Sequence, residues 1–122
     1  MLKKTITYKD YNDVERTEDF YFNLNEAEMI EMELGKEGGL SEFLKKIVAT
    51  KDQPELIKMF KDLVLKAYGE KSADGKRFVK SDEIAIAFSQ TGAYPKLFME
   101  LATNAELAAD FVKAIVPNDI NK

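Results

Sequence analysis

The chain contains no cysteine and no histidine. Without cysteine it cannot form disulfides, thiolate nucleophiles or zinc–sulfur sites. Without histidine it cannot form a Ser-His-Asp triad, an imidazole base or a histidine-ligated metal site. Any catalysis would depend on carboxylates, lysine, arginine, tyrosine or serine, and no spacing of these residues points to such a site. We therefore predict that the protein is not an enzyme, and we assign no catalytic, cofactor-binding or metal-binding residue.

The chain also lacks a long hydrophobic run. Its longest uncharged stretch, from Ile84 to Pro95, is too short and too polar to span a bilayer. Lys3 and Lys4 are followed by no apolar segment of the kind found in signal peptides. We expect no contact with a membrane and a location in the cytosol of the cell that makes the protein.

Composition and charge are those of one globular domain. The 122 residues are 45% hydrophobic and 33% charged, with a formal net charge of −4, which argues against binding to a nucleic-acid backbone. The segment from Asp10 to Glu37 contains ten acidic residues but only two basic ones, Arg16 and Lys36. This bias fits solvated strand and helix faces. It also fits an acidic surface that binds a basic partner or mimics nucleic acid.

Two early segments, residues 2–8 (LKKTITY) and 17–24 (TEDFYFNL), alternate in polarity and are rich in β-branched and aromatic residues. The charged stretch between them resembles a turn. We predict an antiparallel hairpin over residues 1–24, with Ile6 and Tyr8 facing Phe20 and Phe22. A lone hairpin is marginal in water, so it must pack on other elements or pair with another chain; a homo-oligomer is left open.

Residues 25–116 show the three- and four-residue spacing of apolar side chains that is typical of helices, and residues 117–122 form a polar tail. The predicted fold class is α+β, mostly α: an N-terminal β-hairpin followed by a compact bundle of about five to six short helices. All of residues 1–122 are predicted to form a single domain. The predicted buried helical residues are Ala27, Met29, Ile30, Leu34, Phe43, Leu44, Ile47, Val48, Ile84, Ala87, Phe88, Tyr94, Leu97, Phe98, Leu101, Leu107, Ala108, Phe111, Val112 and Ile115.

Local signals set the expected helix boundaries. Asn25 with Glu28, and Thr103 with Glu106, have the spacing of a capping box, and Ser41 and Ser81 are expected to be N-caps. Leu24 and Met29 suit a hydrophobic staple around the first cap. Glycines are expected to end two helices, at Gly69 and Gly92, and Pro117 is expected to end the last one.

The most periodic segment begins at Pro54 and predicts the central helix of the core. Its inward face is expected to carry Leu56, Phe60, Leu63, Val64 and Ala67, widened by Ile57 and Tyr68. A polar loop over residues 69–80 should follow, with a turn at Asp74 and Gly75. This loop lacks the alternating acidic residues of a calcium-binding loop. Its basic residues are balanced by acidic ones, which favours a solvated loop over a phosphate site.

The segments YGEKSADGKRFVKSDE and AFSQTGAYPKLFMELATNAELAADFVKAIVP resemble the small tail assembly chaperones of long-tailed, siphovirus-type bacteriophages and prophages of Gram-positive bacteria. EDFYFNLNEAEM near the start resembles the same family. The resemblance implies a protein that binds and solubilises the tape measure protein and helps to recruit tail tube subunits. It also implies a location in the host bacterial cytoplasm and absence from the mature virion.

Aromatic residues near the motif are our candidates for contact with a partner. We select Phe78, Tyr94, Leu97 and Phe98, although their helical spacing also suits a core. Tyr11 and Tyr21 lie in polar segments and are further candidates. The alternative function is a small acidic adaptor or inhibitor that acts on a nucleic-acid enzyme or a host factor.

Overall fold

The computed structural model describes residues 1–31, 45 and 53–116. Two strands at the start, β1 (Leu2–Lys9) and β2 (Glu15–Phe22), pair antiparallel along their whole length. Ile6, Tyr8, Phe20 and Phe22 lie on one face of this hairpin and are buried, which confirms the predicted pairing of faces. Ile6 and Phe20 are diagonal neighbours, because the register sets Ile6 opposite Glu18.

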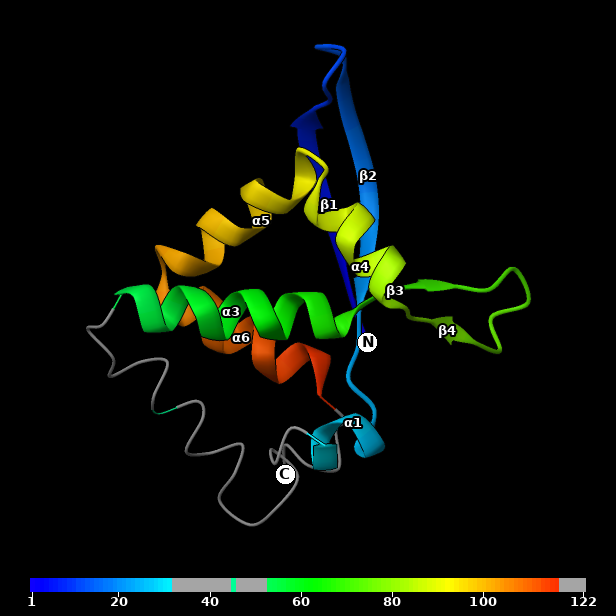
Figure 1. The fold of residues 1–122 in the computed structure, drawn as a ribbon, viewed down its shortest axis with the longest axis vertical. Helices are drawn as coiled ribbons and strands as arrows, with labels where there is room; N and C mark the ends of the chain where they lie inside the picture. The colour runs from blue at the N-terminus through cyan, green and yellow to red at the C-terminus, as the bar shows by residue number, and fades with distance from the viewer. Residues whose placement is uncertain (32–44, 46–52, 117–122) are drawn as a thin grey trace.

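Asp10 organises the turn between these strands. Its Oδ1 accepts hydrogen bonds from the backbone N–H groups of Asn12 and Val14, at 2.8 and 3.0 Å. Its Oδ2 accepts from the Arg16 guanidinium at 2.6 Å. Asp13 takes the left-handed conformation that the turn requires, with φ of 62°. The turn and the parts of both strands next to it project beyond the helices (Figure 1).

The first helix, α1 (Glu26–Glu31), begins with the predicted capping box. Asn25 Oδ1 accepts from the Glu28 N–H at 2.8 Å, and Glu28 Oε1 accepts from the Asn25 N–H at 3.0 Å. Leu24 and Met29 are buried, as expected of a staple. The predicted burial of Ile30 is wrong: its side chain is 71% exposed, because it lies about 100° around the helix from Met29. Ala27 is exposed as well.

The central helix, α3 (Gln53–Ala67), buries Phe60, Leu63, Val64 and Ala67 as predicted. Ile57 is 41% exposed and does not widen the buried face. The side chains of Leu34 and Leu56, the Ser41 cap, and the helix expected around Phe43, Leu44, Ile47 and Val48 lie outside the described residues. The same holds for Pro117 and the tail.

A second hairpin replaces the predicted polar loop. After Ala67 the chain enters β3 (Tyr68–Lys71), turns, and returns as β4 (Phe78–Val79), which extends the sheet to the order β1-β2-β3-β4. Gly69 is therefore a strand residue paired with Tyr21, and the prediction that it ends a helix is wrong. The predicted turn is confirmed at Gly75, whose φ is 74°.

Three helices complete the described chain: α4 (Asp82–Ser89), α5 (Ala93–Ala102) and α6 (Ala105–Ile115). The Ser81 cap is confirmed, because Ser81 Oγ accepts from the Ile84 N–H at 3.1 Å. The predicted cap of the last helix, Thr103, is one residue too early in the sequence. Asn104 caps α6, and the Thr103 hydroxyl instead donates to the Met99 carbonyl at the end of α5.

Several burial predictions for these helices are confirmed and others are wrong. Ala87 and Leu107 are exposed, and Ile84 is half-buried. Gly92 precedes α5 rather than simply ending α4, and a Cβ there would lie 2.7 Å from the Lys9 carbonyl oxygen. The absence of a side chain lets the start of α5 pack directly on the end of β1. The predicted residues found fully buried in α4–α6 are Phe88, Leu97, Leu101, Ala108, Phe111, Val112 and Ile115.

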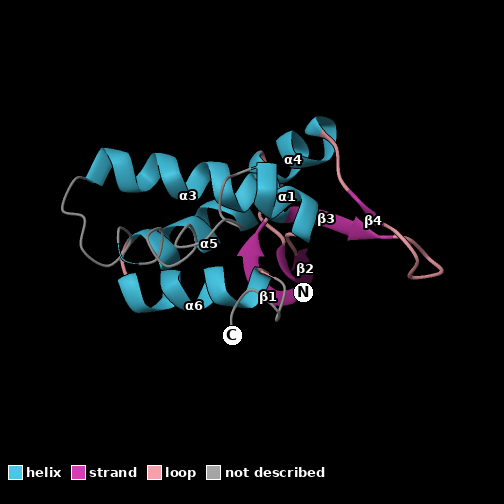
Figure 2. Cartoon of the chain, turned by 90° about the horizontal axis from the view of Figure 1, so that it is seen from below, coloured by secondary structure: helices cyan, strands magenta, loops and turns pink. Residues whose placement is uncertain are grey.

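The helices α3, α5 and α6 gather on one side of the molecule, and the β3–β4 hairpin points away from them (Figures 1 and 2). An aromatic cluster joins strands to helices. The Phe22 ring meets Phe88 and Phe111 edge-on, and Tyr68 stacks on Phe88 with centroids 4.2 Å apart. The predicted class, α+β and mostly α, is confirmed, with five helices among the described residues.

Candidate functional site

A groove of about 540 Å³ lies between the second half of α3 and the start of α4. Leu65, Tyr68, Ala85 and Ile86 supply its apolar lining. Charged side chains of both signs form the rest, namely Glu28, Asp62, Lys66, Lys80 and Asp82. An apolar strip between charged rims suits an amphipathic partner, whose apolar face can be buried while its polar face stays in water.

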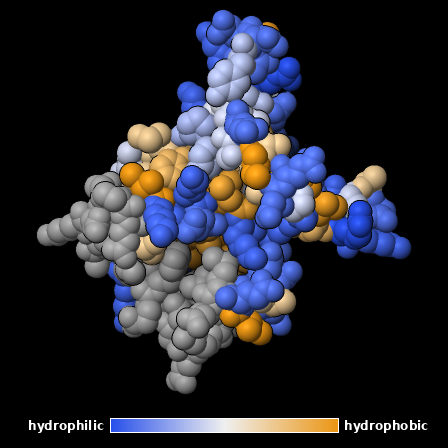
Figure 3. All heavy atoms as spheres, viewed as in Figure 1, coloured by the Kyte–Doolittle hydropathy of each residue, from blue (hydrophilic) through white to orange (hydrophobic). Residues whose placement is uncertain are grey.

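Ile86 is the most exposed apolar side chain of this groove, at 54%. It lies two positions before the buried Phe88, so it is turned roughly 200° around α4 from the core. Figure 3 shows hydrophobic surface over α4 and α5 on this side of the molecule, broken up by hydrophilic side chains. An apolar side chain placed in a groove is a candidate for contact with a partner.

Tyr94 and Phe98 lie together on α5. Their ring centroids are 5.7 Å apart, and Tyr94 meets the ring of Phe88 edge-on at 5.8 Å. Burial raises the pKa of Tyr94, and the nearby carboxylate of Asp62 raises it further. Since Asp62 also lines the groove, Tyr94 lies close to the part of α3 that borders it. Both aromatic side chains are half-buried, so each still presents surface to solvent.

The other two selected residues lie elsewhere. Leu97 is only 1% exposed, so its side chain belongs to the core in this structure. Phe78 lies on β4, on the same face of the sheet as Tyr21 and Lys71. Its ring covers Gly69, where a Cβ would come within 2.7 Å of the ring. Phe78 therefore shapes the second hairpin, and only Tyr94 and Phe98 are neighbours.

An ion pair fixes one end of the groove. Lys80 Nζ lies 2.8 and 2.7 Å from the two carboxylate oxygens of Glu28, and it donates to the Asn23 carbonyl at 2.5 Å. Burial lowers the pKa of Lys80, although the hydrogen bond and the charge of Glu28 act in the opposite direction. The lysine thus ties the strand before α4 to the capping box of α1.

Part of the acidic bias of the first third is neutralised within the fold. Asp10 and Glu18 lie beside Arg16, at 2.6 and 3.6 Å, and Glu28 pairs with Lys80. Lys66 lies 3.3 Å from Glu31. Among the described residues no group of three or more acidic side chains is arranged to hold a metal ion. None of the helices in the described segments is long and apolar enough to cross a membrane.

The whole chain, residues 1–122, matches a family model described as phage tail assembly chaperone. The protein belongs to this family. The match confirms the resemblance at the level of the family, which is a family of chaperones of tail assembly. Neither a curated protein nor a solved structure matches the chain.

The residues that make the chaperone's groove were largely missed by sequence reasoning. Ile86 carries a signal that was available, because it falls outside the face defined by Ile84 and Phe88. The contribution of Leu65 and Tyr68 could not be found in this way, because it depends on how α3 and α4 pack against each other.

Proposed function

We propose that this chaperone binds and solubilises the tape measure protein and helps to recruit tail tube subunits during tail assembly. It acts in the cytoplasm of the host bacterium and is absent from the finished virion. The observation that carries the proposal is membership of the family along the whole chain.

The groove between α3 and α4, with Tyr94 and Phe98 beside it, is the proposed contact surface for the client. A long amphipathic helix of the client would place its apolar face against Ile86, Leu65 and Ala85. Phe78 is a further candidate at the second hairpin, where Lys80 Nζ lies 5.6 Å from its ring centroid and also lines the groove. Many chaperones on one long client would give avidity to contacts that are individually weak.

A pull-down tests this proposal. The tagged chaperone is coexpressed with the tape measure protein, and the amount of client that copurifies is measured. Ile86→Glu should reduce the yield strongly, because it introduces a charge into the apolar strip. Met99→Glu is the matched control, since Met99 is 56% exposed on α5 and does not line the groove. Equal yields from the two folded variants would contradict the proposed surface.

Salt and charge separate this proposal from the acidic adaptor. An apolar contact should survive moderate salt, whereas binding through the acidic surface should weaken as the charges are screened. Reversal of the exposed Glu26 to lysine should leave copurification of the tape measure protein unchanged. A strong loss with this variant would show that the client binds the acidic surface, and would contradict an apolar contact in the groove.

A further inference from the structure

One side of the inner strand β2 is only partly paired among the described residues. β2 pairs with β1 from Glu15 to Phe22, but β3 pairs only with Tyr21 and Phe22 before it turns away toward β4. Residues 15–20 of β2 therefore face no strand on that side within the described chain. The two hairpins diverge from this point (Figure 1).

The backbone groups along this edge point outward at alternate residues. The Asn23 N–H donates to the Ala67 carbonyl at 2.9 Å, so Asn23 faces the β3 side. Because the direction alternates along a strand, Glu15, Thr17 and Asp19 face the same way. Their N–H and C=O groups are thus available for a further strand.

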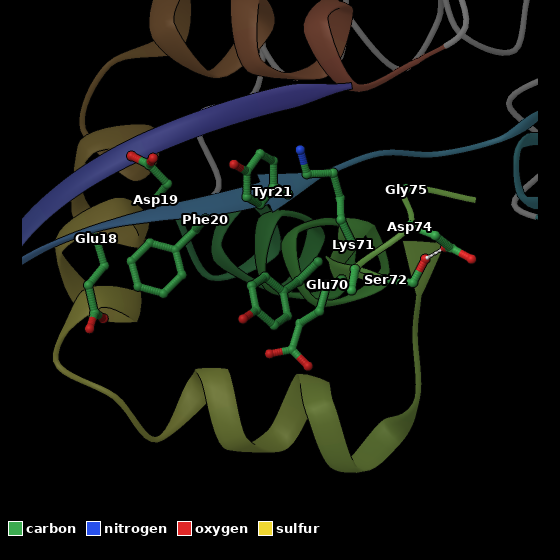
Figure 4. Close-up of a pocket in the computed structure, with 12 residues that line it drawn as sticks. Glu18, Asp19, Phe20, Tyr21, Glu70, Lys71, Ser72, Asp74 and Gly75 are labelled. Atoms are coloured by element: carbon green, nitrogen blue, oxygen red, sulfur yellow. Dashed lines mark hydrogen bonds between the residues drawn. The ribbon is translucent and has the colours of Figure 1, made fainter. Parts of the chain in front are cut away.

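A cleft of about 790 Å³ occupies the fork between β2 and β3. Figure 4 shows Asp19, Tyr21 and Lys71 on one side of the sheet, and Glu18, Phe20 and Glu70 on the other. Phe20 and Tyr68 form its apolar part, with ring centroids 6.4 Å apart. The cleft therefore offers a strand edge together with apolar surface, which are the two features of a site for an added strand.

The charge around the cleft is acidic. Glu18, Asp19, Glu70 and Asp74 line it, and Lys71 is the single basic residue in the lining. Burial raises the pKa of Tyr68, and the charges of Glu70 and Glu18 raise it further, so both carboxylates lie near this phenol. A second copy that offered the same edge would bring like charges together, which is unfavourable.

We propose that the open edge of β2 binds an extended, lysine- or arginine-bearing segment of a partner protein as an added β-strand. The backbone of the segment pairs with Thr17 and Asp19, and its basic side chains lie against the carboxylates of the cleft. This surface meets the groove between α3 and α4 at Tyr68, which lines both, and the proposal does not depend on which tail protein occupies that groove.

The test uses the full chain and a short synthetic peptide that alternates lysine with valine. Titration followed by amide NMR should shift the signals of Glu15–Asp19. Thr17→Pro should weaken binding by about tenfold or more, because it removes an outward N–H and places a ring on the edge. It leaves pairing with β1 intact, since that N–H points away from β1.

Thr7→Pro is the matched control. Thr7 lies opposite Thr17, their hydroxyl oxygens are 2.9 Å apart, and the Thr7 N–H points to the other edge of the hairpin. Both variants lose the same hydroxyl contact, but only Thr17→Pro blocks the proposed site. Thr7→Pro should bind the peptide as the wild type does. Equal loss in the two variants, with both shown by circular dichroism to be folded, would overturn the proposal.

Charge supplies a second comparison. A peptide that alternates glutamate with valine should bind at least about tenfold more weakly than the lysine peptide, and Glu70→Lys should reduce the difference. Equal binding of the two peptides would overturn the proposal that the partner segment is basic. Size-exclusion chromatography provides the remaining outcome: a wild-type oligomer that Thr17→Pro dissociates would show that a second copy occupies the edge, and would also overturn the proposal.

Discussion

Lys80 and Glu28, which are 52 positions apart in the sequence, form a two-pronged ion pair that joins the second hairpin to the first helix. The Lys80 side chain is 20% exposed and that of Glu28 is 14% exposed, so water replaces neither partner well. Glu28 also completes the capping box of α1. One carboxylate thus supports both a helix start and one end of the groove between α3 and α4.

Lys80→Met should lower the free energy of unfolding by about 1–3 kcal/mol, because it leaves the carboxylate of Glu28 partly buried without its cation. Lys66→Met is the control. Its partner Glu31 is 64% exposed, so this change should cost about 0.5 kcal/mol or less. Urea unfolding of both variants measures the difference. Equal losses in the free energy of unfolding would show that the Lys80–Glu28 pair stabilises the fold no more than the exposed pair does.

Phe60→Ala should cost about 3–5 kcal/mol, the range for truncation of a fully buried phenylalanine. Ile57, on the same helix and 41% exposed, should cost less than about 1 kcal/mol when changed to alanine. The urea midpoints of the two variants give the comparison. A loss below about 1 kcal/mol for Phe60→Ala would contradict the central place of α3 in the core.

Gly69→Ala should destabilise the second hairpin, because the new Cβ would lie 2.7 Å from the Phe78 ring and 2.9 Å from the Val79 carbonyl oxygen. Phe78→Ala should relieve part of this cost in the double variant, since it removes the nearer obstacle. Gly75→Ala has open space but a φ of 74°, so its cost of about 1 kcal/mol arises from backbone strain alone. Thermal unfolding of the four variants tests the Gly69 contact. If the destabilisation of the double variant equals the sum of the two single effects, the contact is contradicted.

Alkaline pH should destabilise the protein through its tyrosines. The folded chain raises the pKa of Tyr68 and Tyr94 above 10.0, chiefly by burial. Both groups therefore bind protons more tightly when folded, and this stabilisation, present below pH 10.0, is lost as the pH rises through the folded pKa values.

Unfolding in urea from about pH 9 to 11 measures this effect. Replacement of both tyrosines by phenylalanine should make the decline of stability shallower. Lys80, whose lowered pKa acts in the opposite sense, is common to both proteins and cancels in the comparison. Parallel declines in the two proteins would contradict the assignment.

Sequence reasoning succeeded where structure depends on neighbouring residues. The first hairpin, the Asn25–Glu28 capping box, the Ser81 cap and the turn at Gly75 all follow from local alternation or spacing. The shift from Thr103 to Asn104 is of one residue, since both residue types are able to cap a helix.

The second hairpin and the groove required information that spacing does not hold. β4 is only two residues long, and β3 contains a glycine that disfavours strands, so neither gives a clear pattern. What stabilises them is the pairing of β3 with Tyr21 and Phe22, which are distant in the sequence, together with the cover of Gly69 by Phe78 across the hairpin. Leu97 and its neighbours on α5 share a helical stripe, and only packing decides which of them reaches the surface.

The solubility of the tape measure protein tests the proposed function most directly. The client is expressed alone and together with the chaperone, the cells are lysed, and the client is measured in the soluble and pelleted fractions. The proposal predicts a largely pelleted client in the first case and a largely soluble one in the second, with the Ile86→Glu chaperone giving little rescue. A client that stays in the pellet despite abundant, folded wild-type chaperone would contradict the proposed function.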